Sequence, residues 1–381
     1  MLQHIIRLHE ESIHAPCYGL PYQWEETAPS REIGVLFGHW DTIHIALDAL
    51  ALGSKHGARQ ILNHLALQEK NGMIPGHLAI IDSRIQWTTQ STSPPLWPIA
   101  IHDYLENHIQ EKLLKRCYQA LIRQIEWFEA HRSGEEEGFY YLDYLDRFWE
   151  SGVESGIRYD FSDGVCDTLA CIDATSHMYV LYEYAALWSD LLNESSEEWV
   201  SKALDLKLFI QNELYDSETG YFFDQWNIED PENHKFSFEG MWPVFVGAAA
   251  PDQAQRIIDE YLLNIDHFFT PHPLPTVSVS DPNYSMVSWR GPVYNSMVFW
   301  AAQGCLQYNR SDAAIALIER SLDATNELFE LTECVWECYH PFKDDPRIIE
   351  RPPLEHPLKN HLGHNPIIAM AKLWTDYNPR I

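Results

Sequence analysis

The chain has 381 residues, and several features that mark particular protein classes are missing from it. It contains no run of about 18 apolar residues, the length that crosses a membrane as a helix. The first seven residues, Met1 to Arg7, include no long apolar segment of the kind found in secretory signals. These absences favour a cytoplasmic protein without a membrane span.

Cysteine pairs and metal-binding motifs are also scarce. The seven cysteines are scattered, and none forms a Cys-x-x-Cys pair. Cys334 and Cys338 lie four positions apart, but no second pair completes a zinc site. His340, His361 and His364 cluster nearby in spacings that match no standard zinc pattern. The sequence therefore predicts reduced thiols, no metal and no cofactor.

Positive charge is in short supply. Lys and Arg number 26 against 56 Asp and Glu, which gives a formal net charge of −30. Such a surface repels phosphate backbones and anionic membranes, so neither nucleic acid nor a membrane is predicted as a partner. The composition carries no signal for an oligomeric state.

Aromatic side chains, in contrast, are abundant. They make up 13% of the chain and include 14 Trp and 19 Tyr, within a hydrophobic fraction of 45%. This is enough apolar surface for one large core or two ordinary ones. A core accounts for many of the rings, but the same stock suits a cleft in which rings stack on the C–H faces of a sugar.

Apolar periodicity predicts about twelve helices, most of them in consecutive pairs. The first helix of a pair is often apolar throughout, whereas the second has a charged face, as in Ser311–Arg320 and Asp252–Asp259. An inner ring buried on both sides and an outer ring with one wet face would produce this difference. The predicted helices cover residues 2–13, 40–53, 54–68, 95–106, 109–132, 174–192, 197–215, 238–249, 252–263, 292–308, 311–329 and 365–377.

This pattern predicts an all-α fold, an (α/α)6 barrel in which the first and last helices lie side by side and close the ring. Long loops recur between the pairs, and such loops in a compact domain are usually functional. They would line one cleft at one end of the ring. No Gly/Ser-rich linker or charge run interrupts residues 1–381, so a single domain is predicted; two helical domains fit the even spacing less well. The loops cover residues 70–94, 133–173, 217–237, 264–291 and 330–364.

The segment Arg147–Asp160 has the densest set of chemically active side chains. It contains three carboxylates, two arginines and three aromatic rings within fourteen positions, interrupted by two glycines. Because no regular apolar period runs through it, it is predicted to be a loop. Stacking rings, and carboxylates that accept hydroxyls or move protons, suit a sugar site. The alternative is a surface loop held by salt bridges, with a partly buried Trp149.

The same segment resembles a motif of a known family. Trp149–Asp160 reads W-E-S-G-V-E-S-G-I-R-Y-D and is similar to the W-E-S-G-x-D-N-S-P-R-W-D segment of glycoside hydrolase family 63. That family includes mannosylglycerate and glucosylglycerate hydrolases and is related to trehalases. The resemblance places Glu154, one methylene longer, at the position of the family's catalytic Asp. Trp149, Glu150 and Arg158 are predicted to contact substrate, with Glu150 alternatively a brace for the loop.

Two further segments resemble the family around an aromatic ring. The W-D-T at residues 40–42 resembles W-W-D-[ST], which implies that Trp40 and Asp41 lie in the deepest sugar subsite. Asp41 would alternatively only complement a helix dipole. The segment at residues 288–295 resembles Y-W-R-G-P-[IV]-W, in which Trp289 would stack on sugar. Arg290 would fork to vicinal hydroxyls or, alternatively, pair structurally with a loop carboxylate.

The expected base lies near the end of the chain. Cys334–Pro341 resembles the W-E-x-Y-[ND]-P segment that carries the base of the family, which implies Glu337 as base and places Trp336 beside the substrate. Asn360–Pro366 stands where the family has an F-x-W-T segment, but it lacks the Trp.

Three shorter resemblances are expected to be mainly scaffold. Asn71–Pro75 is similar to a G-M-I-P turn, and Gly220–Trp226 is similar to a G-x-F-x-D turn. Ser91–Trp97 resembles the S-Q-P-P-L segment of trehalases and related hydrolases. It would hold Trp97 or Gln90 near the cleft.

The matched segments together span residues 40 to 366 and imply a mechanism. Glycoside hydrolysis with inversion uses two carboxyls roughly 6.5–9.5 Å apart, with a water between. The resemblance implies Glu154 as general acid, its pKa raised by aromatic neighbours, and Glu337 as ionised base. If Glu154 does not reach the leaving oxygen, Asp160 or Glu150 is the alternative acid.

The predicted function is an inverting α-glycosidase for a small α-linked glucoside or mannoside, such as a disaccharide or a glycosyl-glycerate. The alternative is a catalytically inactive carbohydrate-binding protein on the same scaffold, because Glu154 and the missing Trp depart from the family. A sugar epimerase with paired histidines ranks last, since carboxylates rather than histidines occupy the matched segments.

Overall fold

The computed structural model describes residues 1–29, 32, 34–81, 84–87, 91–108, 110–143, 150–153, 155–160, 168–228 and 230–378. Among the predicted site residues, Trp149 and Glu154 lie outside these ranges, as does Gln90.

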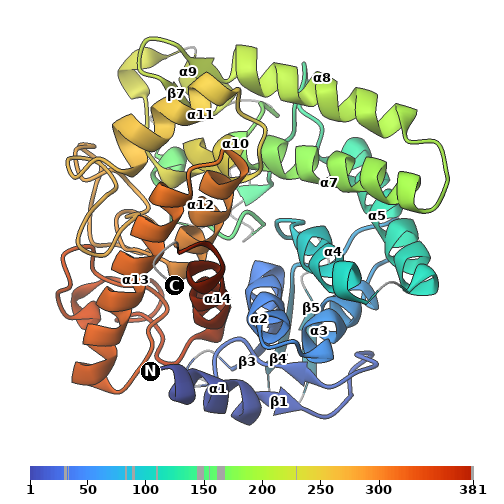
Figure 1. The fold of residues 1–381 in the computed structure, drawn as a ribbon, viewed down its shortest axis with the longest axis horizontal. Coiled ribbons are helices and arrows are strands. Elements are labelled where there is room, and N and C mark those ends of the chain that lie inside the picture. Colours follow the sequence, from blue (N-terminus) through green and yellow to red (C-terminus); the bar gives the residue numbers. More distant parts are fainter. Residues whose placement is uncertain are drawn as a thin grey trace.

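The architecture is a double ring of helices (Figure 1). Each inner helix contacts the next, and the last contacts the first, so the inner ring is closed. The inner helices are α2 (His39–Ala51), α4 (Trp97–Asn107), α7 (Ile172–Leu191), α10 (Trp242–Phe245), α12 (Asn295–Gln307) and α14 (Ile367–Tyr377). The outer helices are α1 (Leu2–Glu11), α3 (Lys55–Leu65), α5 (Glu111–His131), α8 (Glu197–Glu213), α11 (Pro251–Ile257) and α13 (Ser311–Thr332). The predicted (α/α)6 barrel is confirmed, and α1 contacts α14 as expected.

Burial separates the two rings as the apolar pattern predicted. Eleven of the thirteen residues of α2 are buried. In the outer helix α8, four of seventeen are buried, namely Ala203, Leu206, Phe209 and Ile210. An outer helix buries one stripe against the inner ring and leaves its other faces in water.

Two predicted helices are shorter in the structure, for local reasons. Residues 238–249 form a 3-10 turn, Phe238–Met241, followed by the short α10. Pro243 lies in the first turn of α10, and its missing N–H and its ring prevent a continuous helix from running through this point. Helix α12 begins at Asn295 because Val293 is extended and exchanges two backbone hydrogen bonds of 2.8 and 2.9 Å with Tyr339.

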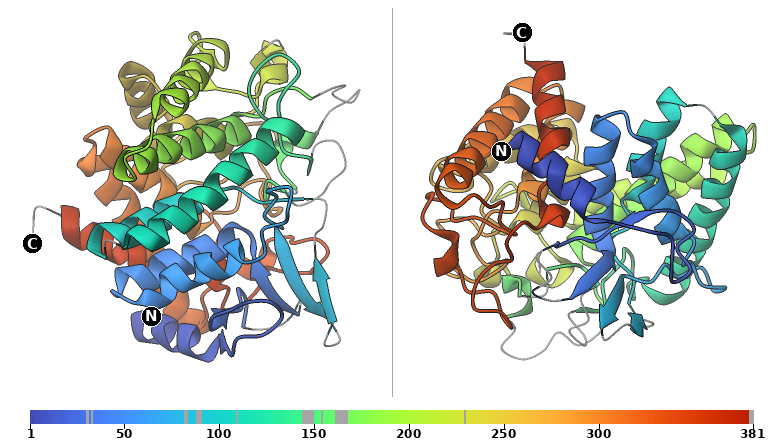
Figure 2. Two further views of the ribbon diagram at one scale, coloured as in Figure 1. Left: turned by 90° about the vertical axis from the view of Figure 1, so that its right-hand side faces the viewer. Right: turned by 90° about the horizontal axis from the view of Figure 1, so that it is seen from below.

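Short antiparallel sheets were not predicted. The largest has the order β3-β4-β5, from β3 (Val35–Gly38), β4 (His77–Ile81) and β5 (Arg84–Trp87). Two-stranded pairs form between β1 (Ile13–His14) and β2 (Trp24–Glu25), and between β6 (Tyr215–Asp216) and β7 (Tyr221–Phe222). Strand β3 runs directly into α2, and the left view of Figure 2 shows β4 and β5 at one end of the ring.

The described parts of the loops that precede the inner helices lie at this same end of the ring (Figure 2). Within the described ranges, no helix has both the length and the apolar character that crossing a membrane would require.

Candidate active site

Predicted site residues converge at the N-terminal ends of the inner helices. Asp41 lies in the first turn of α2. The loop with Trp289 and Arg290 leads into α12, and the segment from Glu337 to His364 leads into α14. Unpaired N–H groups give each helix N-terminus a partial positive charge. This end of the ring therefore favours carboxylates and hydroxyl oxygens.

The backbone before Asp41 is unusually tight. Gly38 has φ +115°, and a Cβ there would lie 2.5 Å from the carbonyl oxygen of Gly76. Its N–H donates to Thr42 Oγ1 at 2.9 Å. Only glycine fits this turn, which joins strand β3 to helix α2 and fixes the direction of Asp41.

Two neutral histidines face Asp41. Its carboxylate oxygens lie 3.6 Å from His364 Nε2 and 4.0 Å from His361 Nε2, and the two imidazoles stack at 5.1 Å. Burial lowers the pKa of His361 to about 4 and that of His364 well below its ordinary value. Both rings are therefore uncharged at neutral pH. His340, the third histidine of the group noted in the sequence, does not join this pair. Its Nδ1 lies 3.7 Å from the carboxylate of Asp344.

Glu337 is a buried carboxylate held as an anion. Arg351 reaches Oε1 with Nε and Nη2, both at 2.9 Å, and the backbone N–H of Leu358 donates to Oε2 at 3.1 Å. Burial alone would raise the pKa of Glu337, but the charge of Arg351 and these hydrogen bonds lower it below its ordinary value. An ionised carboxylate here suits a general base.

A column of indoles runs through the middle of the ring. Trp289 lies 5.9 Å from Trp40, Trp40 lies 6.5 Å from Trp242, and Trp242 lies 6.2 Å from Trp300, between ring centroids. Trp289 also stacks on Tyr294 at 3.8 Å with the planes 4° apart. The predicted stacking residues Trp40 and Trp289 therefore lie together at one end of this column, where they are 1% and 3% exposed.

The loop at residues 150–160 is fastened to the same site. Arg290 forks to Asp160 at 2.5 and 2.6 Å, and its Nε donates to the carbonyl oxygen of Ser155 at 2.8 Å. Gly152 packs so closely on α2 that a Cβ would lie 2.5 Å from His39 Cε1. Arg290 thus makes the structural pairing that the sequence left as an alternative.

Glu150 is engaged by protein groups on both oxygens. Arg132 donates from Nε at 2.8 Å and from Nη2 at 2.9 Å. The backbone N–H groups of Thr92 and Leu142 donate at 2.9 and 2.6 Å. The side chain is fully buried, so this carboxylate braces the loop.

Arg158 also makes buried ion pairs. Its Nη1 and Nη2 donate to Asp173 and Asp224, both at 2.9 Å, and its Nε lies 3.7 Å from Glu239. These partners come from α7, from the start of α9 (Gln225–Ile228) and from the turn before α10. The arginine ties the start of α7 to the segments that lead into α9 and α10.

Two predicted tryptophans lie in the core. The indole N–H of Trp97 donates to Gln124 at 2.7 Å, and its ring packs on Trp188 at 5.8 Å. The indole N–H of Trp336 donates to Thr332 at 3.2 Å. The structure brings Trp40, Asp41, Trp289, Arg290 and Glu337 together, and it places Trp97 between helices. Sequence reasoning missed Arg351 because the residue lies in no matched motif. Its ion pair with Glu337 appears only in the folded chain.

The cluster of Asp41, His44 and His364 resembles a metal site in composition. His44 Nδ1 donates to the carbonyl oxygen of Gly363 at 2.6 Å, and Nε2 accepts the indole N–H of Trp300 at 2.9 Å. Both assignments follow from the partners, since a carbonyl only accepts and an indole N–H only donates. His44 has no lone pair left for a cation.

A second buried cluster, Cys171, Asp173 and Asp224, has a comparable composition. The guanidinium of Arg158 already pairs with both of its carboxylates. Neither cluster of the described residues therefore fits a metal ion.

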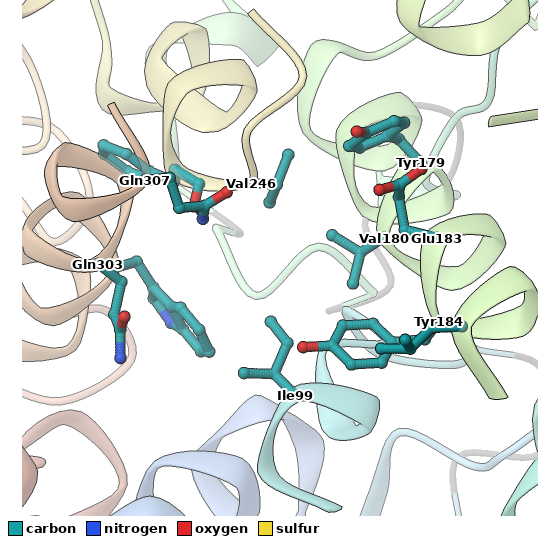
Figure 3. Close-up of a pocket in the computed structure, with 11 residues that line it drawn as sticks. Ile99, Tyr179, Val180, Glu183, Tyr184, Val246, Gln303 and Gln307 are labelled. Atoms are coloured by element: carbon teal, nitrogen blue, oxygen red, sulfur yellow. The ribbon is translucent and has the colours of Figure 1, made fainter. Parts of the chain in front are cut away.

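A separate cavity of about 390 Å³ opens on the axis of the ring, toward the C-terminal halves of α7 and α12. Figure 3 shows Tyr184, Gln303 and Gln307 around it. Trp300, the lower end of the indole column, also lines it. The motif residues lie at the other end of the column.

Comparison with known proteins identifies the family. The family model of the mannosylglycerate hydrolase MGH1-like glycoside hydrolase domain matches residues 38–352. The chain belongs to this family. The resemblance to glycoside hydrolase family 63 is thereby confirmed.

Relatives and solved structures agree with this assignment. An uncharacterised protein of Borreliella burgdorferi is 24% identical over 294 residues, which cover 74% of this chain and 58% of that protein. The cytosolic neutral trehalase of Kluyveromyces lactis is 27% identical over 131 residues, covering 31% of this chain and 17% of the trehalase. The chain thus spans less than two thirds of these curated relatives.

The solved structures share the fold. The mannosylglycerate hydrolase of Thermus thermophilus in complex with glucose has a TM-score of 0.73 at 15% identity and covers 98% of this chain and 99% of its own. The neutral trehalase of Saccharomyces cerevisiae has a TM-score of 0.68 at 17% identity, covering 92% of this chain and 74% of its own.

Proposed function

We propose that this protein is an inverting glycoside hydrolase that cleaves a small α-linked glucoside or mannoside, of the disaccharide or glycosyl-glycerate type. The observation that carries the proposal is Glu337, a buried anion beside His361 at the end of the ring where Asp41 and two indoles converge. Family membership supports the enzyme class, and the mannosylglycerate hydrolase and trehalase relatives support the substrate class.

The reaction needs one proton acceptor and one proton donor. Glu337 takes a proton from a water as the water oxygen attacks the anomeric carbon. The bond to the leaving oxygen breaks, and that oxygen receives the proton of Glu154. The other candidate acids suit this role poorly, because Glu150 and Asp160 each form a forked ion pair with an arginine, which occupies both of their oxygens.

The remaining residues bind the sugar. Trp289 and Trp40 provide stacking faces, and the Asp41 carboxylate accepts hydrogen bonds from sugar hydroxyls. Arg290 contributes indirectly, since it holds the loop at Ser155 and Asp160.

A panel of α-glucosides and α-mannosides, including trehalose and glycosyl-glycerates, tests the proposal, with the anomer of the released sugar followed by NMR. Glu154→Gln and Glu337→Gln should each lower kcat by several orders of magnitude while KM changes little. The exposed Glu232→Gln is the matched control. Product with retained configuration, or near-normal turnover by Glu337→Gln, contradicts the proposal.

A carbohydrate-binding protein without turnover is the second candidate. It is favoured by the engagement of both Glu337 oxygens, one by Arg351 and one by the N–H of Leu358. Calorimetric binding of a glycoside by the wild-type protein, with no product after prolonged incubation, would select this candidate.

A further inference from the structure

Glu239 is a buried carboxyl that the proposed mechanism does not use. It lies in the 3-10 turn before α10, and its side chain is 3% exposed. Its Oε1 lies 3.7 Å from Arg158 Nε, and no described residue forms a hydrogen bond with that oxygen. Asp173 and Asp224 take the two closer positions on the same guanidinium, at 2.9 Å each.

Three carboxyls around one guanidinium would leave two uncompensated negative charges in a buried site. A bound proton on one of them relieves that cost. Burial, against the opposing charge of Arg158, raises the pKa of Glu239 to about 7 and that of Asp224 to about 6. Glu239 lies farthest from the guanidinium, at 3.7 Å, so the positive charge of Arg158 favours its ionised form least. The proton is therefore expected on Glu239.

The neighbouring elements offer no other positive charge. Strand β7 contributes Tyr221, and α7 contributes Asp173 and His177. Burial lowers the pKa of His177 to about 3, so its ring is neutral. Helix α10, which also packs against the turn, has no ionisable residue. Arg158 is therefore the one cation that these described elements place beside Glu239.

Glu239 also touches the loop that carries residue 154. A Cβ on Gly156 would lie 3.3 Å from Glu239 Oε1 and 3.1 Å from Val153 Cγ1, so the glycine packs directly against the carboxyl. The Gly156 N–H closes a turn onto the Val153 carbonyl at 3.0 Å. Arg290 fastens the same turn at Ser155.

We propose that Glu239 is a positioning residue that holds Val153 and Gly156, the described residues on either side of position 154, against the Arg158 cluster, and that it does so in its protonated form. A neutral carboxyl packs on the turn while Arg158 keeps Asp173 and Asp224. An ionised Glu239 draws the guanidinium away from them and adds a negative charge beside the turn. The inference rests on the proposed function only because that turn carries Glu154.

Activity gives the first test. Glu239→Gln, a neutral isostere, should keep kcat within a few-fold at pH 6, and the alkaline limb of its pH profile should move to higher pH. Glu239→Ala should lose at least tenfold in kcat at every pH, because it leaves a void beside Gly156. Glu232→Gln should match the wild type. Abolished turnover in folded Glu239→Gln, or an unmoved alkaline limb, would overturn the proposal.

Stability gives a second test that needs no turnover. The pKa of Glu239 is raised from its ordinary value of 4.5, so its stabilising proton is fully bound below that pH and lost as pH rises through about 7. The Tm of Glu239→Gln relative to wild type should therefore climb by several degrees from pH 4.5 to 7 and then level off. A Tm difference between Glu239→Gln and wild type that does not change with pH would contradict the proposal that Glu239 is protonated. This test holds whether or not the protein hydrolyses a glycoside.

Discussion

Arg351 sets the charge of Glu337, although the two lie in different parts of one long loop. The guanidinium opposes the effect of burial on the carboxyl, and without it burial alone would govern the proton affinity. Arg351→Met should raise the pKa of Glu337, so the acidic limb of the kcat/KM profile should move toward neutral pH. The value of kcat/KM at pH 7 should fall at least tenfold.

The neighbouring Arg347 provides the matched control. It pairs with Asp345 at the surface, where its side chain is 62% exposed, so Arg347→Met should leave the profile unchanged. An acidic limb that stays in place in Arg351→Met would mean that Glu337 owes its charge to other groups.

The matched motifs lead to one end of the ring, but Trp97, Glu150 and Arg158, which were predicted to meet substrate, are bound to protein groups instead. The protein partners of these side chains were not predicted. Glu337 was predicted from the segment around it, but Arg351 has no motif of its own. Arg158 was predicted to meet substrate, and its carboxyl partners at residues 173, 224 and 239 come from three separate elements. Ion pairs over such separations depend on the folded chain. Glu154 as acid stays a prediction.

At the scale of elements, Gly152 decides how closely the loop approaches α2. It has φ +76°, and a Cβ would lie 2.5 Å from His39 and 2.9 Å from Trp40. Gly152→Ala should lower Tm and reduce kcat at least tenfold, because it combines backbone strain of about 1 kcal/mol with a collision at the site.

Gly19 provides the control that separates backbone strain from the steric collision at the site. Its φ is +85°, but open space surrounds the position of a Cβ. Gly19→Ala should therefore show the backbone strain alone, with unchanged kcat. If both alanine variants behave alike, the approach of the loop to His39 does not matter for activity.

The helices were predictable because their apolar period is local, and the hairpins follow from it. The sheet β3-β4-β5 was not, because β3 pairs with a strand about forty residues later, as in the Phe37–Leu78 pair. The stretch around β4 and β5 was assigned to a loop, despite the apolar residues from Leu78 to Ile81. Pro243 was a visible signal for the break before α10.

At the scale of the whole molecule, a net charge of −30 acts on any charged substrate. The field slows the approach of anions, and salt screens it over about 10 Å at 0.1 M. If both are hydrolysed, kcat/KM for an anionic glycosyl-glycerate should rise two- to threefold between roughly 10 and 200 mM salt. The value for neutral trehalose should stay flat. Equal salt responses would show that local cations at the site outweigh the overall charge.

Closure of the ring was predicted from the number of hairpins and is confirmed. The position of the site, expected from the loops that precede the inner helices, stays a prediction. That the whole chain forms a single domain stays a prediction.

The indole column has a consequence for observing this protein. Four indoles whose neighbouring ring centroids lie 5.9 to 6.5 Å apart exchange excitation energy, so light absorbed at Trp300 can be emitted from Trp289. A glycoside that settles on Trp40 or Trp289 would alter the emission and the near-ultraviolet dichroism of the entire column. The intrinsic tryptophan signal of the protein thus reports ligand binding without an added label.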